Sequence, residues 1–167
     1  MGKQQYGSEA LAFIARRDAV GAEAMIKTME ADDDFMESIY NQQFVCTIQV
    51  SCALIKGDNP AIVFSLIKKG LRFTIPHFSE KYIIDYLLTS NDIVLINQLA
   101  CLYWDNGEKE KAIETLKALM ANFDNACVDT HYRSRYYPTL IFNLTKYLNE
   151  TGKNEEALAL CDKGIDI

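Results

Sequence analysis

The chain has 167 residues, of which 49% are hydrophobic and 24% charged, and its formal net charge is −6. This length suits one domain with a sizeable buried core, so we expect residues 1–167 to form a single domain. The negative charge argues against a chain that binds a nucleic-acid backbone by itself, and no apolar run reaches the roughly 18 residues that a membrane span needs.

The amino terminus and the cysteines predict a cytoplasmic protein without a metal site. Residues 1–6 lack the apolar core of a signal peptide. The cysteines are odd in number and never spaced as Cys-x-x-Cys, so we favour buried, reduced thiols over disulfides or metal ligands. These cysteines are Cys46, Cys52, Cys101, Cys127 and Cys161. His77 and His131 lack metal-spaced partners as well, and we expect no metal, no cofactor and no enzymatic activity.

The first part of the chain shows the apolar spacing of helices. Apolar residues three and four positions apart predict two short helices over 8–17 and 20–31, followed by a longer helix over 34–56. The segment from Lys56 to Pro60 then combines a C-terminal Gly, an Asp or Asn cap, and a Pro that suits the first helical position. A further helix over 60–70 is expected after this turn.

The same spacing continues to the end of the sequence, and the alternation typical of strands is almost absent. Further helices are expected over 79–89, 92–106, 109–123, 130–149 and 154–165. The sequence therefore predicts an all-α chain of about nine helices joined by short turns.

A repeat of 45 residues relates the last two helix pairs. Gly107 and Gly152 are 45 residues apart, and so are Ala112 and Ala157. Each Gly is expected to end a helix in a left-handed turn, because it has no Cβ to clash there. Each Ala, five residues after the Gly, is expected to let the second helix of the pair pack closely against the first, because its side chain is small.

This repeat resembles the tetratricopeptide repeat family. The residues that match the family signature in order are Ala100, Tyr103, Gly107 and Ala112. The following unit matches in part, because Leu148 stands where the signature has an aromatic residue. The resemblance is good over residues 92–167 and poor over 35–72. It implies a right-handed superhelix of antiparallel helix hairpins whose first helices line a concave groove.

A narrower resemblance lies in the C-terminal part, which is similar to the helical sensor domain of peptide-responsive bacterial helix-turn-helix regulators of the XRE type. The similar residues are Tyr137-Pro138, Asn143-Leu144, Gly152, Glu155-Glu156-Ala157 and Cys161 to Ile165. The resemblance implies a ligand-sensing and oligomerising domain that reaches DNA only through a separate helix-turn-helix domain. The chain is then a fragment or truncated regulator that lacks the DNA-binding domain. The alternative is a free-standing interaction scaffold without a transcriptional role.

The tetratricopeptide pattern also implies which side chains line the groove. Asn suits this position, because its amide offers both a donor and an acceptor to an extended peptide. The implied groove residues are Asn97, Gln98, Cys101, Trp104, Phe142, Asn143, Lys146 and Asn149. We expect them to bind a short peptide or the tail of a protein partner. The alternative is that Asn97 and Asn143 only satisfy buried backbone groups.

The last helix pair is expected to associate with a second copy of the chain. The helix over 154–165 carries an apolar strip that needs cover, formed by Leu158, Cys161 and Ile165. A homodimer is the expected assembly.

Overall fold

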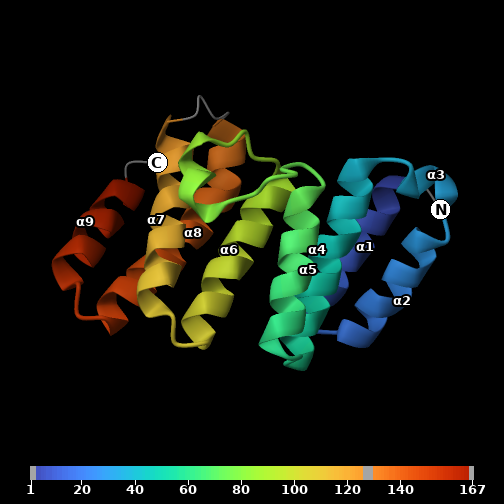
Figure 1. Ribbon diagram of the computed structural model, residues 1–167, viewed down its shortest axis with the longest axis horizontal. Helices are drawn as coiled ribbons and strands as arrows, with labels where there is room; N and C mark the ends of the chain where they lie inside the picture. The colour runs from blue at the N-terminus through green and yellow to red at the C-terminus, as the bar shows by residue number, and fades with distance from the viewer. Residues whose placement is uncertain (1–2, 126–129, 166–167) are drawn as a thin grey trace. The chain divides into compact units, whose positions relative to one another are not determined.

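Every regular element in the described part of the chain is a helix (Figure 1). The structure, a computed structural model, describes the backbone of residues 3–125 and 130–165, and the side chains of residues 6–125 and 133–162. The prediction of an all-α chain is confirmed. The superhelical arrangement of the hairpins stays a prediction.

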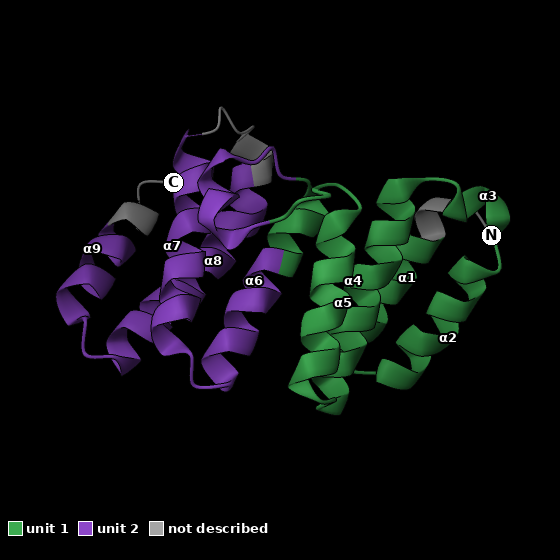
Figure 2. Cartoon of the chain, viewed as in Figure 1, with its two compact units in different colours: residues 1–78, 89–95 green, residues 79–88, 96–167 purple. Residues whose placement is uncertain are grey.

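The described residues fall into two compact units (Figure 2). The first unit holds residues up to Phe78 together with Thr89–Leu95. Its elements are α1 (Lys3–Ala15), α2 (Ala19–Glu30), α3 (Asp33–Met36), α4 (Ile39–Lys56), α5 (Pro60–Arg72) and the start of α6 (Ser90–Asp105). Helix α4 is central to this unit, because it packs against α1, α2, α3 and α5. The rings of Tyr6 and Phe35 meet edge to face in its core, with centroids 5.4 Å apart.

The helix expected over 34–56 is two helices, α3 and α4, so this prediction is wrong. Side chains at the start of α4 bind the carbonyl groups at the end of α3. Asn41 Nδ2 donates to the Phe35 oxygen at 2.7 Å, and Gln42 Nε2 donates to the Met36 oxygen at 2.8 Å. Because these carbonyl groups are satisfied by side chains, the backbone can leave the helix between Met36 and Ile39.

A fully buried carboxyl group joins three segments of the first unit. Asp92, in the first turn of α6, accepts hydrogen bonds from Gln43 Nε2 of α4 at 2.6 Å and from the Thr89 backbone N–H at 2.8 Å. The Thr74 hydroxyl, which follows α5, donates to the same carboxyl group at 2.5 Å. Asp92 therefore fastens the beginning of α6 to α4 and to the end of α5.

The second unit holds residues 79–88 and the chain from Ile96 onward. Its elements are the 3₁₀ helix η1 (Glu80–Asp85), the remainder of α6, α7 (Lys109–Asn125), α8 (Thr130–Glu150) and α9 (Asn154–Ile165). Helix α7 contacts η1 and α8, and α8 contacts α9. Phe123 and Tyr137 are fully buried where α7 meets α8, with ring centroids 6.0 Å apart.

The two expected glycine turns are confirmed. Gly107 and Gly152 have φ angles of 83° and 77°, in the left-handed region that a residue with a Cβ rarely adopts. In both turns, the N–H of the residue after the glycine donates to a carbonyl five residues earlier at 2.9 Å, which closes the end of the helix. Ala112 and Ala157 are buried, as the repeat predicts.

The segment 79–89 was expected to be an α-helix and contains only the short η1, so this prediction is wrong. Asn122 of α7 is 6% exposed, and its Nδ2 donates to the carbonyl oxygens of Ile83 at 2.9 Å, Ile84 at 3.2 Å and Tyr86 at 2.8 Å. Because a side chain of α7 satisfies these carbonyl groups, the segment does not need the backbone bonds of an α-helix.

Candidate functional site

Two of the predicted groove residues contact each other between α6 and α8. Asn143 Nδ2 of α8 donates to Asn97 Oδ1 of α6 at 3.0 Å. Both side chains are half-buried. Within the described part of the chain, neither side-chain amide bonds to a backbone group. The structure thus brings together two predicted groove residues from corresponding helices, although the 45-residue repeat aligns Asn143 with Gln98 and not with Asn97, which is 46 residues away.

Each amide keeps part of its hydrogen-bonding capacity. An Asn side chain carries one carbonyl oxygen and two N–H groups. Among the described residues, the Asn143 oxygen and the Asn97 nitrogen have no partner. Exchanging the orientations of both amides would still leave one acceptor and one donor. The pair therefore presents an available donor and an available acceptor on neighbouring helices.

One turn further along α6, Cys101 faces the same residues of α8. Its Sγ lies 3.9 Å from Asn143 Nδ2, and its thiol is close enough to the Tyr147 hydroxyl for each to influence the pKa of the other. Burial raises the pKa of the Cys101 thiol above its ordinary value, and burial together with the Cys101 hydrogen bond raises the pKa of Tyr147. Both groups are therefore neutral near pH 7 and act here as hydrogen-bonding, uncharged side chains.

Trp104 ends this row of contacts. Its ring stacks on Tyr147, with centroids 4.0 Å apart and an interplanar angle of 2°. Lys109 Nζ lies 4.9 Å from the centroid of the Trp104 ring. The indole is thus held by neighbours of the same unit, and the stack fixes the spacing between the ends of α6 and α8.

Three other predicted groove residues lie along a separate stripe of α8. Phe142, Lys146 and Asn149 are spaced four and three positions apart, so they share one helix face. Phe142 is 69% exposed, Lys146 Nζ lies 3.9 Å from Glu150 Oε1 on the same helix, and Asn149 is exposed. Among the contacts described, these side chains do not join the row formed by Asn97, Cys101, Asn143, Trp104 and Tyr147.

Sequence reasoning missed Tyr147, which binds Cys101 and stacks on Trp104. Its signal was the helical spacing itself, because Tyr147 lies one turn after Asn143 and so shares its face. Gln98, the remaining predicted residue, is half-buried beside Asn97.

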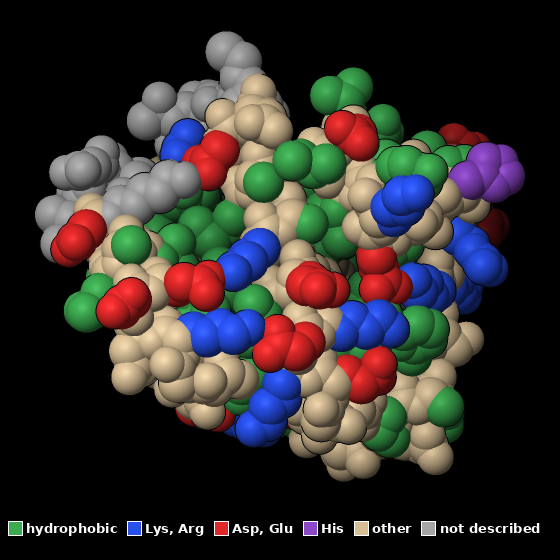
Figure 3. Space-filling model, turned by 60° about the vertical axis from the view of Figure 1, so that its left-hand side comes forward, with side chains coloured by type: hydrophobic (Ala, Val, Ile, Leu, Met, Phe, Trp, Pro, Cys, Tyr) green, Lys and Arg blue, Asp and Glu red, His purple; other side chains and the backbone are tan. Residues whose placement is uncertain are grey.

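Charged side chains of α7 and α9 are interspersed by sign. Figure 3 shows acidic and basic side chains alternating over the face that it draws. Lys117 of α7 forms an ion pair with Glu156 of α9, and Lys153 pairs with Glu110 at 2.8 Å. Among the described side chains of this face, Figure 3 shows no continuous basic stripe of the kind that binds a phosphate backbone.

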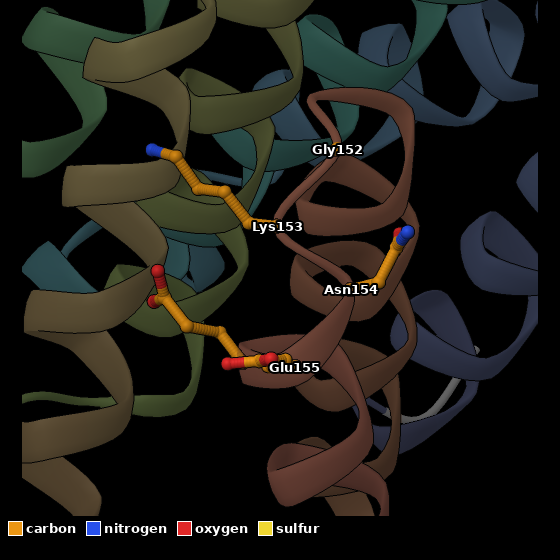
Figure 4. A pocket seen from close by; sticks show the side chains of 5 residues that line it. Gly152, Lys153, Asn154 and Glu155 are labelled. Carbon is orange, nitrogen blue, oxygen red and sulfur yellow. The ribbon is translucent and has the colours of Figure 1, made fainter.

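A hollow of about 430 Å³ lies at the turn before α9, lined by Gly152–Glu156. Figure 4 shows Lys153 and Asn154 pointing away from this turn in different directions. The Lys153 ammonium already donates to Glu110, so the hollow offers no unpaired cation from this residue. We assign no ligand to it.

The described residues contain no cluster of three or more His, Cys, Asp or Glu side chains suited to a metal ion. A candidate membrane-spanning helix is likewise not found in the part of the chain that the structure describes. The side chain of His131 lies outside the described residues.

Comparisons of the chain with models of protein families, with curated proteins and with solved structures gave no match.

The described cysteines differ in exposure, which predicts an order of reactivity. Cys46 and Cys52 are buried, Cys101 is half-buried and Cys161 is exposed, so the expectation of buried thiols is wrong for Cys161. Burial raises the pKa of the thiols of Cys46, Cys52 and Cys101, which lowers the fraction of reactive thiolate. In a Cys127→Ser background, we expect Ellman's reagent at pH 8 to modify Cys161 at least about tenfold faster than the others.

Mass spectrometry of quenched samples would identify the modified peptide, and the denatured variant serves as the control in which all four thiols react. Rapid labelling of Cys101 would contradict its placement against Asn143 and Tyr147.

Proposed function

We propose that the second unit binds a short, extended peptide across α6 and α8. The pair formed by Asn97 and Asn143 carries this proposal, because it holds an available donor and an available acceptor on neighbouring helices. A peptide unit presents one C=O and one N–H, so the Asn97 amide nitrogen can donate to the first and the Asn143 oxygen can accept from the second.

The contacts around the pair support a preorganised site. The Cys101 thiol lies 3.9 Å from the Asn143 amide nitrogen, and the stack of Tyr147 on Trp104 holds the two helices at a fixed spacing. A rigid site loses less conformational entropy when it binds a ligand. In this mode of binding, the two Asn amides form hydrogen bonds with the peptide backbone. Preference for particular peptide side chains would come from the residues around the pair.

We further propose that the chain is the ligand-sensing and oligomerising domain of a transcriptional regulator in the cytoplasm. The resemblance of residues 137–165 to peptide-responsive regulators supports this role, with DNA bound through a separate helix-turn-helix domain. The alternative is a scaffold that recruits a protein partner without a transcriptional role. A helix-turn-helix coding segment upstream in the same reading frame would favour the regulator over the scaffold.

Loss of both amides is expected to abolish specific peptide binding. An array of heptapeptides identifies binders, and fluorescence anisotropy then measures their affinity. For a peptide that binds the wild-type chain, Asn97→Ala combined with Asn143→Ala should weaken binding by about tenfold or more, because two hydrogen bonds are lost. The matched control is Asn106→Ala, in the exposed turn after α6, which should leave binding unchanged.

An array without any binder, or equal affinity of the double variant and the wild type, would reject this site.

We also propose that the last hairpin pairs with a second copy of the chain. Leu158 of α9 is 67% exposed and Cys161 is exposed, so part of the apolar strip expected here is open. The side chain of Ile165 lies outside the described residues. Light scattering at micromolar concentration should report a dimer, and Leu158→Lys should shift it toward the monomer. A wild-type chain that is monomeric under these conditions would contradict the pairing.

A further inference from the structure

A cleft of about 330 Å³ opens in the first unit between α2 and α5, with α4 as its floor. It is lined by Glu23, Ile26, Gln49, Cys52, Ala53, Lys56, Asp58, Leu66 and Lys69. All of these residues are described, and none belongs to the peptide site proposed for the second unit.

Two polar side-chain contacts join α2 to α4 beside the cleft. Lys56 Nζ donates to Glu23 Oε1 at 2.7 Å, and Gln49 Nε2 donates to Glu30 Oε1 at 3.0 Å. Gln49 and Lys56 both line the cleft and are seven residues apart on α4, which corresponds to about 10.5 Å along a helix. The cleft therefore has room along α4 for a short chain molecule.

Two small residues of α4, Cys52 and Ala53, form an apolar part of the cleft floor. Cys52 and Ala53 are each 3% exposed, and both are small, so they leave space where larger side chains would fill it. Ile26 on α2 and Leu66 on α5 flank this floor from opposite sides. An aliphatic group lying here would be removed from water on three sides.

The charges around the cleft leave one cation available. Lys56 is paired with two carboxylates, with Glu23 at 2.7 Å and with Asp58 at 3.5 Å, so this group of three side chains is negative overall. Lys69 has no acidic partner within 4 Å among the described residues. Burial raises the pKa of the Cys46 thiol on α4, and the Lys69 ammonium partly offsets this, which places that ammonium near α4.

We propose that this cleft binds a small monocarboxylate with a short aliphatic chain. The carboxylate pairs with the Lys69 ammonium, and the chain lies over Cys52 and Ala53 between Ile26 and Leu66. Glu23 and Asp58 both pair with Lys56, so this group carries one net negative charge, which disfavours a carboxylate beside it and favours a carboxylate beside Lys69.

The second unit contains a similar cleft that serves as an internal comparison. It measures about 210 Å³ and lies over α8 between α7 and α9. When Gly57 is aligned with Gly152, 95 residues later, Gln49 and Ala53 correspond to Leu144 and Leu148 on its floor. The cation on its rim, Lys117, is paired with Glu156 across the cleft, so we expect no carboxylate binding there.

Hexanoate is a suitable probe, and the full chain carrying ¹³C-labelled methyl groups is the sample. We expect saturable shifts of the Ile26, Ala53 and Leu66 methyl signals on titration with hexanoate, and no such shifts of Leu144 and Leu148. Lys69→Gln should weaken the binding by about fivefold or more, because a charge-assisted contact is lost. The matched control, Lys27→Gln, removes an exposed cation of α2 that does not line the cleft, and should leave binding unchanged.

Hexanamide, which lacks the negative charge, should bind about fivefold more weakly than hexanoate or less well still. The proposal is overturned if hexanoate causes no saturable shift at Ile26, Ala53 and Leu66. It is also overturned if hexanamide binds equally well, if Lys27→Gln weakens binding as much as Lys69→Gln, or if Leu144 and Leu148 shift to the same extent. None of these results bears on the peptide site between α6 and α8, since that site lies in the other unit.

Discussion

Replacement of Asp92 by Ala is expected to lower the free energy of unfolding of the first unit by about 3 kcal/mol. The carboxyl group is fully buried and receives hydrogen bonds from Gln43, Thr74 and Thr89. Without it, the Thr89 N–H and the Thr74 hydroxyl would lose this acceptor, while Gln43 Nε2 would keep the Gly70 oxygen at 3.2 Å and the Thr74 hydroxyl at 2.9 Å. The cost comes from the lost bonds and from the space left by the buried carboxyl group, since Ala itself suits a helix.

Urea unfolding followed by far-ultraviolet circular dichroism measures this loss. Asp105→Ala is the matched control, because it removes the same group from the exposed end of the same helix and should change stability by no more than about 0.5 kcal/mol. An Asp92→Ala variant as stable as the control would show that the cluster does not fasten α6 to α4.

Replacement of Asn122 by Ala is expected to release the segment of residues 79–88 from α7 and to cost about 2 kcal/mol. One amide group of Asn122 serves the carbonyl oxygens of Ile83, Ile84 and Tyr86. Its removal leaves these oxygens without this donor, in a buried position for Ile83 and in partly buried positions for Ile84 and Tyr86. Asn122→Asp should be at least as harmful, because a carboxylate has the same shape but faces the carbonyl oxygens with a negative charge.

Hydrogen exchange of the Tyr82 and Tyr86 amides reports on this segment directly, since these amides donate to Ser79 and Ile83 within the segment. Both should exchange faster in Asn122→Ala than in the control Asn125→Ala, which changes an exposed Asn at the end of the same helix. Unchanged exchange in Asn122→Ala would mean that other contacts hold the segment.

The helices and their glycine turns could be predicted because local chemistry decides them. The left-handed conformations at Gly107 and Gly152 follow from the absence of a Cβ. The start of α5 likewise follows from Asn59, whose side chain caps the Ala61 N–H at 2.8 Å, and from Pro60 after it. In each case the deciding residues lie within one helical turn of the feature that they produce.

The errors fall where a distant side chain replaces local hydrogen bonds. The segment over 79–89 has a helical apolar pattern, yet Asn122, more than thirty residues away, accounts for its carbonyl groups. The buried bond between Gln43 and Asp92 joins residues 49 positions apart. A single sequence gives no local signal for such pairs, because each residue alone is an ordinary polar residue in or near a helix.

The candidate peptide site could be predicted from the sequence only in part. The repeat of 45 residues places Asn97 and Asn143 on corresponding helices, at positions that differ by one residue, and the structure places their amides 3.0 Å apart. The repeat does not show which face of α8 packs against α6, because Phe142 and Asn143 are adjacent in sequence and both were predicted to line the groove. Only the packing shows that Asn143 and Tyr147 face α6 while Phe142 is exposed.

Peptide recognition between α6 and α8 is tested most directly by the side-chain amide signals of Asn97 and Asn143 in ¹⁵N nuclear magnetic resonance spectra. When a peptide selected from the array binds, both signals should shift and saturate at the affinity measured by anisotropy, while the Asn106 signal stays in place. If the peptide saturates the protein and the Asn97 and Asn143 signals do not move, the peptide binds elsewhere and the site assigned to this face is wrong.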